Sequence, residues 1–286
     1  MTALVTDAGI DGFDADAFVA RVLAEDLGEG GDVTSAAVIP AEARFAGVMA
    51  TRDAVVVAGL AIAEHVFRAL DPDVRVERLV EDGASAAPGT VLMRVEGRAR
   101  ALLTAERSAL NTVQHLSGIA SMTRAYVDRI AGTGATLLDT RKTIPGLRLV
   151  EKYATRMGGA RNHRMGLWDA AMIKDNHVAV AGDVGEAVRR ARAAGIAEVI
   201  VEVDRIDQIE PAIGAGATRL LLDNMAPPVL RGAVTLVSGR VPTEASGGVT
   251  LETIRAIAET GVDFISVGRL TQSAPAADIG LDFALA

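Results

Sequence analysis

The chain has no cysteine, few aromatic residues and no long hydrophobic run, and each shortage excludes a class of protein. Without cysteine it can form no disulfide, thiolate nucleophile or cysteine-bound zinc site. Aromatic residues are only 3%, so the core must be built from Ala, Val, Leu and Ile. No stretch approaches the roughly 20 apolar residues that span a bilayer, and the first residues lack the pattern of a secretory signal. These absences predict a soluble cytoplasmic protein.

Charge is distributed unevenly along the 286 residues. The formal net charge is −8, yet segment 141–174 carries eight Lys or Arg against two acids, which is +6 in 34 residues. The other 252 residues therefore sum to −14. A positive segment in an acidic protein indicates local binding of anions, provided that the charges converge in a cleft. The segment holds one Tyr and one Trp, few platforms for stacking bases, so small anions are favoured over nucleic acid.

From about residue 130 on, β-branched apolar runs alternate with amphipathic stretches. Asp183 and Thr250 are expected helix N-caps, and Gly195 and Gly261 are expected left-handed helix ends. The alternation predicts βαβ units around a parallel sheet. The expected strands are 135–140, 198–204, 218–225, 241–248 and 263–269, and the expected helices are 183–195 and 250–261.

The first 115 residues have a different pattern, which predicts a separate α+β layer. Short alternating runs and a Pro-Gly turn are typical of antiparallel strands. The expected strands are 43–59, 74–83 and 90–99, and the expected helices are 60–70 and 99–117.

Polar residues recur where the predicted parallel strands end. Glu202, Asp223 and Glu244 are spaced 21 residues apart, each near the end of its apolar run. In a barrel these strand ends form one rim, where active sites lie. A single acid there would more often cap the following helix, but the repeat beside a basic segment favours a site. Arg141 and Lys142 directly follow another strand. A sugar diphosphate with Mg²⁺ fits such a mixture of cations and acids.

The remaining basic residues and histidines have less specific patterns. His65 and His115 lie in apolar helical patterns and are expected to be structural. His163 is expected to have a hydrogen-bonding or charge role, and His177 either caps a helix or contacts substrate. The spacing of four residues indicates a solvated helix face for Arg148, Lys152 and Arg156.

Several long motifs together resemble the quinolinate phosphoribosyltransferase family, also called nicotinate-nucleotide pyrophosphorylase (carboxylating). They are LLDTRKTIPGLRLVEKYA, GGARNHRMGLWDAAMIKDNH, LLLDNM, ASGGVTLETI and TGVDFISVGRLTQS, with EDLGEGGDVTS and TAERSALNTVQHLSGIA before them. The resemblance runs from about residue 20 to the C-terminus. Two departures stand out. Gln272 lies where the family commonly has a histidine, and EDLGEGGD is one residue longer than usual.

The resemblance implies an α/β fold with two domains. An N-terminal α/β sandwich, 1–115, is joined by the C-terminal tail, about 275–286, and an open, incomplete α/β barrel of parallel strands, 116–274, carries the active site. The implied reaction transfers the phosphoribosyl group of phosphoribosyl pyrophosphate to quinolinate with decarboxylation. It gives nicotinate mononucleotide, pyrophosphate and CO2 in de novo NAD biosynthesis. Mg²⁺ and a homodimer, or a higher oligomer, are also implied.

The resemblance also implies roles for individual residues. Four residues, Lys142, Lys174, Glu202 and Asp223, are expected to be catalytic, and the two acids among them to lie near the ribose hydroxyls and Mg²⁺. Arg107 is expected to reach the neighbouring subunit's pocket. The quinolinate carboxylates are expected to contact Arg141, His163, Arg164 and Lys174, and the substrate pocket also includes Thr140. The loops around the 5′-phosphate are expected to contribute Ser246, Gly247, Gly248, Gly268 and Arg269.

Three alternatives remain at this point. A paralogue associated with molybdenum transport shares the fold, although the sequence IKDNH argues against it. A nicotinate phosphoribosyltransferase would take a substrate with a single carboxylate. A non-catalytic binder of phosphosugars would keep the acids for folding alone.

Overall fold

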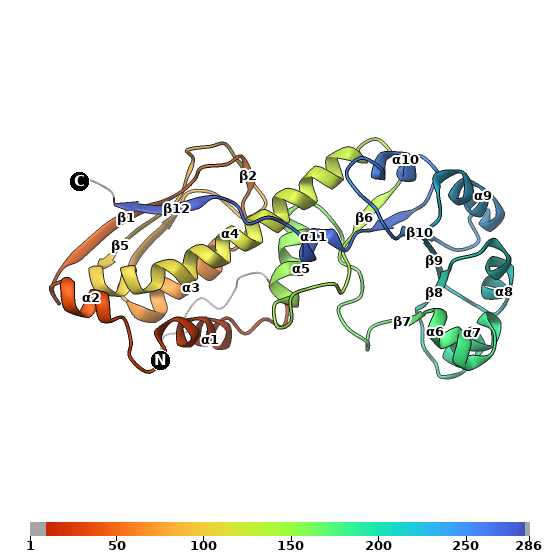
Figure 1. Cartoon of the computed structure of the whole chain (residues 1–286), viewed down its shortest axis with the longest axis horizontal. Helices are drawn as coiled ribbons and strands as arrows, with labels where there is room; N and C mark the ends of the chain where they lie inside the picture. Colours follow the sequence, from red (N-terminus) through yellow and green to blue (C-terminus); the bar gives the residue numbers. More distant parts are fainter. Residues whose placement is uncertain (1–9, 284–286) are drawn as a thin grey trace. The chain divides into compact units, whose positions relative to one another are not determined.

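The computed structural model describes residues 10–283, which divide into two compact units (Figure 1). Unit 1 takes the residues up to Met122, the segment Leu149–Gly159 and the residues from Ser273 on. Unit 2 consists of Thr123–Arg148 and Ala160–Gln272. Within residues 10–283, no helix has the length and apolar character needed to cross a membrane.

Unit 1 is built around an antiparallel sheet with the strand order β12-β1-β5-β3. The strands are β1 (Arg44–Thr51), β3 (Arg75–Arg78), β5 (Val91–Arg98) and β12 (Ile279–Phe283), and a small second pair joins β2 (Val55–Val56) to β4 (Ser85–Ala86). The helices are α1 (Ala15–Leu27), α2 (Val33–Val38), α3 (Leu60–Leu70), α5 (Arg148–Met157) and the first part of α4 (Ala99–Arg129). Because β12 pairs with β1, the C-terminal segment belongs to this unit.

Unit 2 is a six-stranded parallel sheet with the order β6-β11-β10-β9-β8-β7. Its strands are β6 (Thr136–Leu138), β7 (Ala171–Ile173), β8 (Val199–Val203), β9 (Arg219–Asp223), β10 (Thr243–Ser246) and β11 (Phe264–Ser266). Figure 1 shows the connecting helices beside these strands; they are α6 (Asp175–Ala181), α7 (Val184–Ala193), α8 (Ile209–Gly214), α9 (Pro227–Val237), α10 (Ile254–Ala258) and α11 (Arg269–Gln272), with the 3-10 turn η1 (Ile206–Gln208). With β6 and β7 at its two edges, the sheet is open, and the predicted α/β fold class is confirmed.

The central strands of unit 2 are short apolar runs that are buried along most of their length. The three residues Val199–Val201 and the three residues Leu220–Leu222 are buried, whereas Glu202 and Asp223 at the strand ends are partly exposed. This pattern is typical of a parallel sheet covered by helices. The polar residues at the carboxyl ends of the strands therefore lie close together, because parallel strands all end on the same side of the sheet.

Several local predictions are confirmed. Helix α3 spans the predicted 60–70, and Asp183 caps α7 by accepting a hydrogen bond from the Glu186 N–H at 2.8 Å. Gly195 and Gly261 have φ values of 79° and 92°, the left-handed conformation that suits glycine at helix ends.

Other local predictions are wrong. The predicted helix 250–261 is reduced to α10, and its N-cap is Thr253 instead of Thr250, since residues 251–253 form a turn. The predicted strand 43–59 ends at Thr51, where the chain turns before β2, and the helix predicted for 99–117 continues to Arg129. The predicted solvated face of α5 is wrong for Lys152, which is fully buried, whereas Arg156 is exposed and Arg148 is partly exposed.

Candidate active site

A pocket of about 680 Å³ opens at the carboxyl ends of the unit 2 strands. Every residue that lines it belongs to unit 2. The pocket brings together all the predicted site residues except one, namely Thr140, Arg141, Lys142, His163, Arg164, Lys174, Glu202, Asp223, Ser246, Gly247, Gly248, Gly268 and Arg269. The exception is Arg107, which is exposed on α4 in unit 1. Four of the eight basic residues of segment 141–174 therefore converge on one cavity: Arg141, Lys142, Arg164 and Lys174.

The segment after β6 places two cations at the pocket. Thr140 Oγ1 accepts a hydrogen bond from the Lys142 N–H at 3.0 Å, and Thr271 Oγ1 donates to the Lys142 carbonyl at 2.8 Å. The Lys142 side chain lies over Gly268, where an added Cβ would come within 2.6 Å of Lys142 Cδ. Gly268 thus leaves room for the lysine, and the loop holds Lys142 against the start of α11.

Two arginines lie close together on the same wall of the pocket. Arg164 Nη1 donates to the Ala170 carbonyl at 3.0 Å, which fixes its guanidinium. Burial, and then the charge of nearby Arg141, lowers the pKa of Arg164. Arg141 Nε is buried with no hydrogen-bond partner among residues 10–283. Two guanidinium groups that repel each other are stabilised by an anion placed between them.

Two carboxylates face these cations from neighbouring strands. Glu202, on β8, forms an ion pair with Lys174 Nζ. Burial, and then the charge of Glu202, raises the pKa of Asp223, while Lys174, a hydrogen bond from Asn224 and Lys142 oppose the shift. Asp223 ends β9, beside Glu202. The pair concentrates negative charge that a cation, or a substrate part that becomes positive, would stabilise.

A glycine loop follows β10 and forms another part of the pocket. Gly247 has φ of 94°, and an added Cβ would come within 2.1 Å of Asn224 Oδ1. Asn224 itself donates its N–H to the Ser246 carbonyl at 2.9 Å and its Nδ2 to Asp223 Oδ2 at 2.6 Å. Only glycine fits at 247, because any side chain would meet both the strained backbone and the Asn224 amide.

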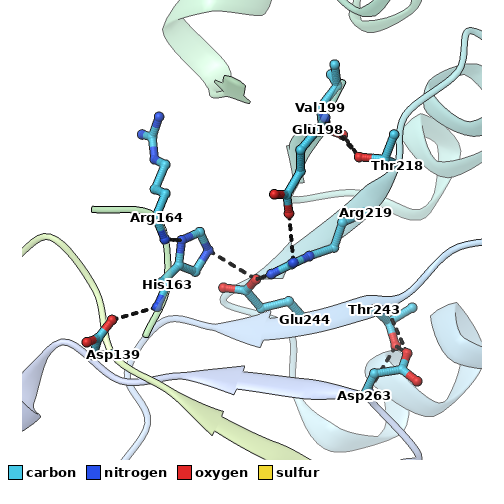
Figure 2. Close-up of polar contacts among 10 residues, drawn as sticks. All are labelled: Asp139, His163, Arg164, Glu198, Val199, Thr218, Arg219, Thr243, Glu244 and Asp263. Carbon is cyan, nitrogen blue, oxygen red and sulfur yellow. Dashed lines mark hydrogen bonds and ion pairs between the residues drawn. The ribbon is translucent and has the colours of Figure 1, made fainter. Parts of the chain in front are cut away.

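Beneath the pocket, His163 is part of a buried polar network (Figure 2). Asp139 Oδ1 accepts the His163 N–H at 2.8 Å, and Asp139 Oδ2 accepts from Asn162 at 2.6 Å. The ring atom Nδ1 accepts the Arg164 N–H at 2.7 Å, and Nε2 lies 3.3 Å from Glu244 Oε2. Glu244 is fully buried, although it lines the pocket. The network fixes the loop between α5 and β7.

The other histidines are outside the pocket. His177 Nδ1 accepts the Lys174 N–H at 2.9 Å, so it caps α6, as one of its two predicted roles requires. His65 is buried in α3 and contacts Asp16 at 2.6 Å, while His115 lies 2.9 Å from Glu151; both are structural, as expected.

Sequence reasoning predicted Glu244 only as a member of the acidic series and assigned no role to two other polar residues that line the pocket, Asn224 and Ser266. Glu244 is the third member of the 21-residue series, so its spacing was the available signal. Asn224 gave a weaker signal, an Asn directly after a strand-ending Asp. Gln272, at the position of the family histidine, also lines the pocket.

Known proteins similar to this chain include quinolinate phosphoribosyltransferases and nicotinate-nucleotide pyrophosphorylases. Residues 32–117 match the family described as "Quinolinate phosphoribosyl transferase, N-terminal domain", and residues 119–282 match its C-terminal domain. "Nicotinate-nucleotide pyrophosphorylase [carboxylating]" of Mycobacterium leprae is 46% identical over 92% of this chain and 95% of its own length. "Quinolinate phosphoribosyltransferase [decarboxylating] 1b" of Nicotiana tabacum is 39% identical over 98% of this chain and 88% of its own length.

Among solved structures, the nicotinate-nucleotide pyrophosphorylase from Ehrlichia chaffeensis superposes with a TM-score of 0.92. It is 38% identical, and the match covers 96% of this chain and 100% of that one.

Proposed function

The chain belongs to the quinolinate phosphoribosyltransferase family, and we propose that the pocket of unit 2 is where it carries out the family reaction. That reaction joins quinolinate to the phosphoribosyl group of phosphoribosyl pyrophosphate and releases pyrophosphate and CO2, leaving nicotinate mononucleotide for NAD biosynthesis. One observation carries the proposal: basic side chains from separate stretches of the chain line one pocket and face Glu202 and Asp223.

The basic wall suits the charges of both substrates. Quinolinate is a dianion and phosphoribosyl pyrophosphate a polyanion, so they repel each other unless cations lie between them. Arg141 and Arg164 would grip the quinolinate carboxylates, since a guanidinium binds a carboxylate through two parallel hydrogen bonds. Lys142 and Lys174 would contact the diphosphate as compact charges. Holding both reactants in one orientation would itself lower the barrier.

The two acids suit the charge that develops during transfer. As the bond from ribose C1 to the pyrophosphate oxygen breaks, positive charge grows on the sugar, and the fixed carboxylates of Glu202 and Asp223 would stabilise it. The quinolinate nitrogen then forms the new bond to C1, which makes the ring a pyridinium. The bond to the 2-carboxylate breaks, its electron pair stays on the ring carbon beside the positive nitrogen, and a proton from solvent replaces CO2.

Mg²⁺ fits the same two acids as a metal that arrives with its substrate. Residues 10–283 hold no cluster of three or more ligating side chains, so an all-protein cage is not available there. Burial and then the charge of Glu202 raise the pKa of Asp223 although nearby cations oppose the shift, so a further cation at the acid pair would be favourable. Mg²⁺ commonly binds one or two carboxylates together with substrate phosphates. When bound, it would neutralise the charge of the leaving pyrophosphate.

The glycine loop and α11 would hold the 5′-phosphate. Ser246, Gly247 and Gly248 offer backbone N–H groups and a hydroxyl, and Arg269 adds a charge beside Gly268. Gln272 can donate a hydrogen bond to phosphate but carries no charge, so this contact would be weaker than one from a protonated histidine.

We further propose a homodimer, in which Arg107 of one subunit reaches the other subunit's pocket, and a cytoplasmic location. The exposure of Arg107 on α4 supports the homodimer. The charge of the substrates supports the cytoplasmic location, because multiply charged molecules do not cross an apolar bilayer unaided. Cross-linking and cell fractionation test the two points.

The test of the activity is direct. Purified protein supplied with quinolinate, phosphoribosyl pyrophosphate and Mg²⁺ should release CO2 and form nicotinate mononucleotide in equal amounts. Lys174→Ala should abolish turnover, whereas Arg189→Ala, which removes an exposed cation of α7 paired with Glu186, should leave it unchanged. Turnover of nicotinate without CO2 would instead indicate a nicotinate phosphoribosyltransferase, and binding without products would indicate a phosphosugar binder.

A further inference from the structure

Glu244 is a fully buried carboxylate to which the reaction outlined above gives no task. It lies on β10, and its side chain faces His163. Its Oε1 makes no hydrogen bond with any residue in the range 10–283. Burying an incompletely satisfied carboxylate costs stability. An apolar residue would therefore serve folding better at this position, which points to a role in the pocket above it.

The hydrogen bonds of His163 define where its ring proton lies. Nδ1 accepts the Arg164 N–H at 2.7 Å, and a nitrogen that accepts a hydrogen bond carries no proton. The proton of a neutral ring is then on Nε2, which lies 3.3 Å from Glu244 Oε2. Adding a second proton at Nδ1 would set two donors face to face, so the contact with Arg164 favours the neutral ring.

Arg219 compensates the charge of Glu244, as Figure 2 shows. Its Nη1 lies 3.3 Å from Glu244 Oε2, its Nη2 donates to Glu198 at 2.7 Å, and its guanidinium stacks on the Phe264 ring at 4.8 Å. Burial acts to raise the pKa of Glu244, but His163, then Ser266 and, more weakly, Arg219 hold that pKa below its ordinary value. The charge of Arg219 compensates Glu244 whatever the protonation state of His163.

Charged groups surround His163 on several sides. Glu244 faces the ring from β10, with Arg219 of β9 behind it, and Asp139 faces the backbone of His163 from the end of β6. Arg164 follows directly in the chain, and its guanidinium reaches the pocket while its backbone is tied to the ring.

We propose that Glu244 is a positioning residue: held by Arg219, it faces Nε2 and fixes the orientation of the His163 ring, so that the unprotonated Nδ1 anchors the Arg164 backbone and aims the Arg164 guanidinium at the substrate. His163 then orients a cation instead of acting as one. The inference rests on the proposed function only for the identity of that substrate, a pyridine dicarboxylate.

The ring state of His163 is measured first, in the unaltered protein. Nitrogen-15 NMR of histidine-labelled protein distinguishes a neutral ring with Nε2–H from one with Nδ1–H and from the cation. His163→Gln assigns the signal, since the chain has only four histidines. The expected result at neutral pH is the form with the proton on Nε2. A cationic ring or the Nδ1–H form at neutral pH overturns the proposal.

Variants then test the consequence for the substrate. Glu244→Gln keeps an acceptor for Nε2–H and should retain the ring state and most activity. Glu244→Leu removes the acceptor, and the KM for quinolinate should rise about tenfold or more, as for loss of a well-aimed charged hydrogen bond. The KM for phosphoribosyl pyrophosphate should change less than about twofold. Equal changes in both KM values would contradict a role directed at Arg164.

A matched control lies on the neighbouring strand segment. Asp263 accepts hydrogen bonds from the N–H and Oγ1 of Thr243, next to Glu244, without touching His163 (Figure 2). Asp263→Asn should affect stability alone; if it reproduces the quinolinate effect, Glu244 is merely structural. Absence of turnover in the unaltered protein would refute the proposed function, while the ring measurement would still decide the inference. Should Glu244→Leu fail to fold, the unaltered protein and Glu244→Gln decide it.

Discussion

Individual side chains in the pocket of unit 2 carry charge where burial disfavours it. Burial and then the charge of Arg141 lower the pKa of Arg164, and the buried Arg141 Nε has no hydrogen-bond partner among residues 10–283. An anion that binds both guanidinium groups removes this penalty. Binding energy is therefore concentrated in a few residues, and each can be tested alone.

Arg141→Ala should weaken quinolinate binding far more than binding of phosphoribosyl pyrophosphate. The change removes one of two guanidinium groups for the carboxylates, a charged hydrogen bond of about 1.5–3 kcal/mol, so the KM for quinolinate should rise roughly tenfold to a hundredfold. Steady-state kinetics with each substrate varied in turn measures both constants. Equal losses for the two substrates would refute the assignment of Arg141 to the carboxylates.

Asp71 in unit 1 should make stability depend on pH in acid. Burial acts to raise its pKa, but the Arg98 N–H at 2.7 Å and the Arg98 guanidinium hold that pKa below its ordinary value. A carboxylate with a lowered folded pKa stabilises above its unfolded pKa of about 3.9, and the gain is lost as pH falls through the folded value. Asp71→Asn should cost about 1–3 kcal/mol at pH 7.

The difference between Asp71→Asn and the unaltered protein should shrink below about pH 4. Urea unfolding at several pH values measures it, with Asp73→Asn, an exposed neighbour, as the control. A difference that stays constant into acid would show that the Asp71 charge is irrelevant.

Sequence patterns predicted which residues would gather at the pocket better than which would be buried below it. Arg141, Lys174 and Glu202 follow strands, and strand ends can be located from apolar runs alone. Lys152 was expected in solvent because a spacing of four residues reports only a shared helix face. Whether that face meets water or another element depends on tertiary packing, which the spacing does not contain.

Secondary-structure elements in this chain are positioned by close backbone contacts as well as by side chains. The clearest close backbone contact is in unit 1, where α4 packs against residues 275–279. The Gln114 carbonyl accepts the Ala277 N–H at 2.9 Å, and Gln114 Nε2 donates to the Ile279 carbonyl at 2.6 Å. An added Cβ at Gly118 would lie 2.0 Å from the Pro275 carbonyl oxygen. A glycine in the middle of a helix is thus required by packing.

Gly118→Ala should destabilise unit 1 by about 1–3 kcal/mol, because the backbone of Pro275 must move away. The overlap outweighs the gain in helix propensity of about 1 kcal/mol that alanine brings. Gly232→Ala in α9 is the control, since nothing lies within 4 Å of its added Cβ. It should be neutral or stabilising. Thermal unfolding compares the two, and equal effects would contradict the packing argument.

Element boundaries were predictable where local chemistry marks them and not elsewhere. Asp183 before α7 and Gly195 after it are strong signals, and both were identified correctly. Segment 250–261 has an equally good apolar pattern, but its first residues belong to the turns that follow the glycine loop of the pocket. The geometry of that loop overrides the helical preference of the residues after it.

At the scale of the whole molecule, the pocket is lined by unit 2 alone, while Arg107 lies in unit 1. The proposed dimer gives Arg107 a pocket to serve in the other subunit. Sequence reasoning could propose this only through resemblance, because no periodicity or spacing reveals which surface of a chain meets a second copy.

Mixing Arg107→Ala with Lys142→Ala, each inactive alone, should restore part of the activity. In a mixed dimer, one pocket keeps its Lys142 and receives an intact Arg107 from the other subunit. Co-expression followed by activity assay measures the recovery. Lys142→Ala mixed with Lys174→Ala is the control, since every pocket then keeps a lesion. If Arg107 serves its own subunit, both mixtures stay inactive.

The pairing of β12 with β1 has a consequence for how this protein is made. A ribosome delivers β12 after every other element described for the chain, so β1 must wait through synthesis of all of unit 2 with one side of its backbone unpaired. An unpaired strand edge in a nascent chain invites pairing with other chains. Translation products that stop before β12 should therefore aggregate through unit 1, and chaperones would be needed most until β12 has been synthesised.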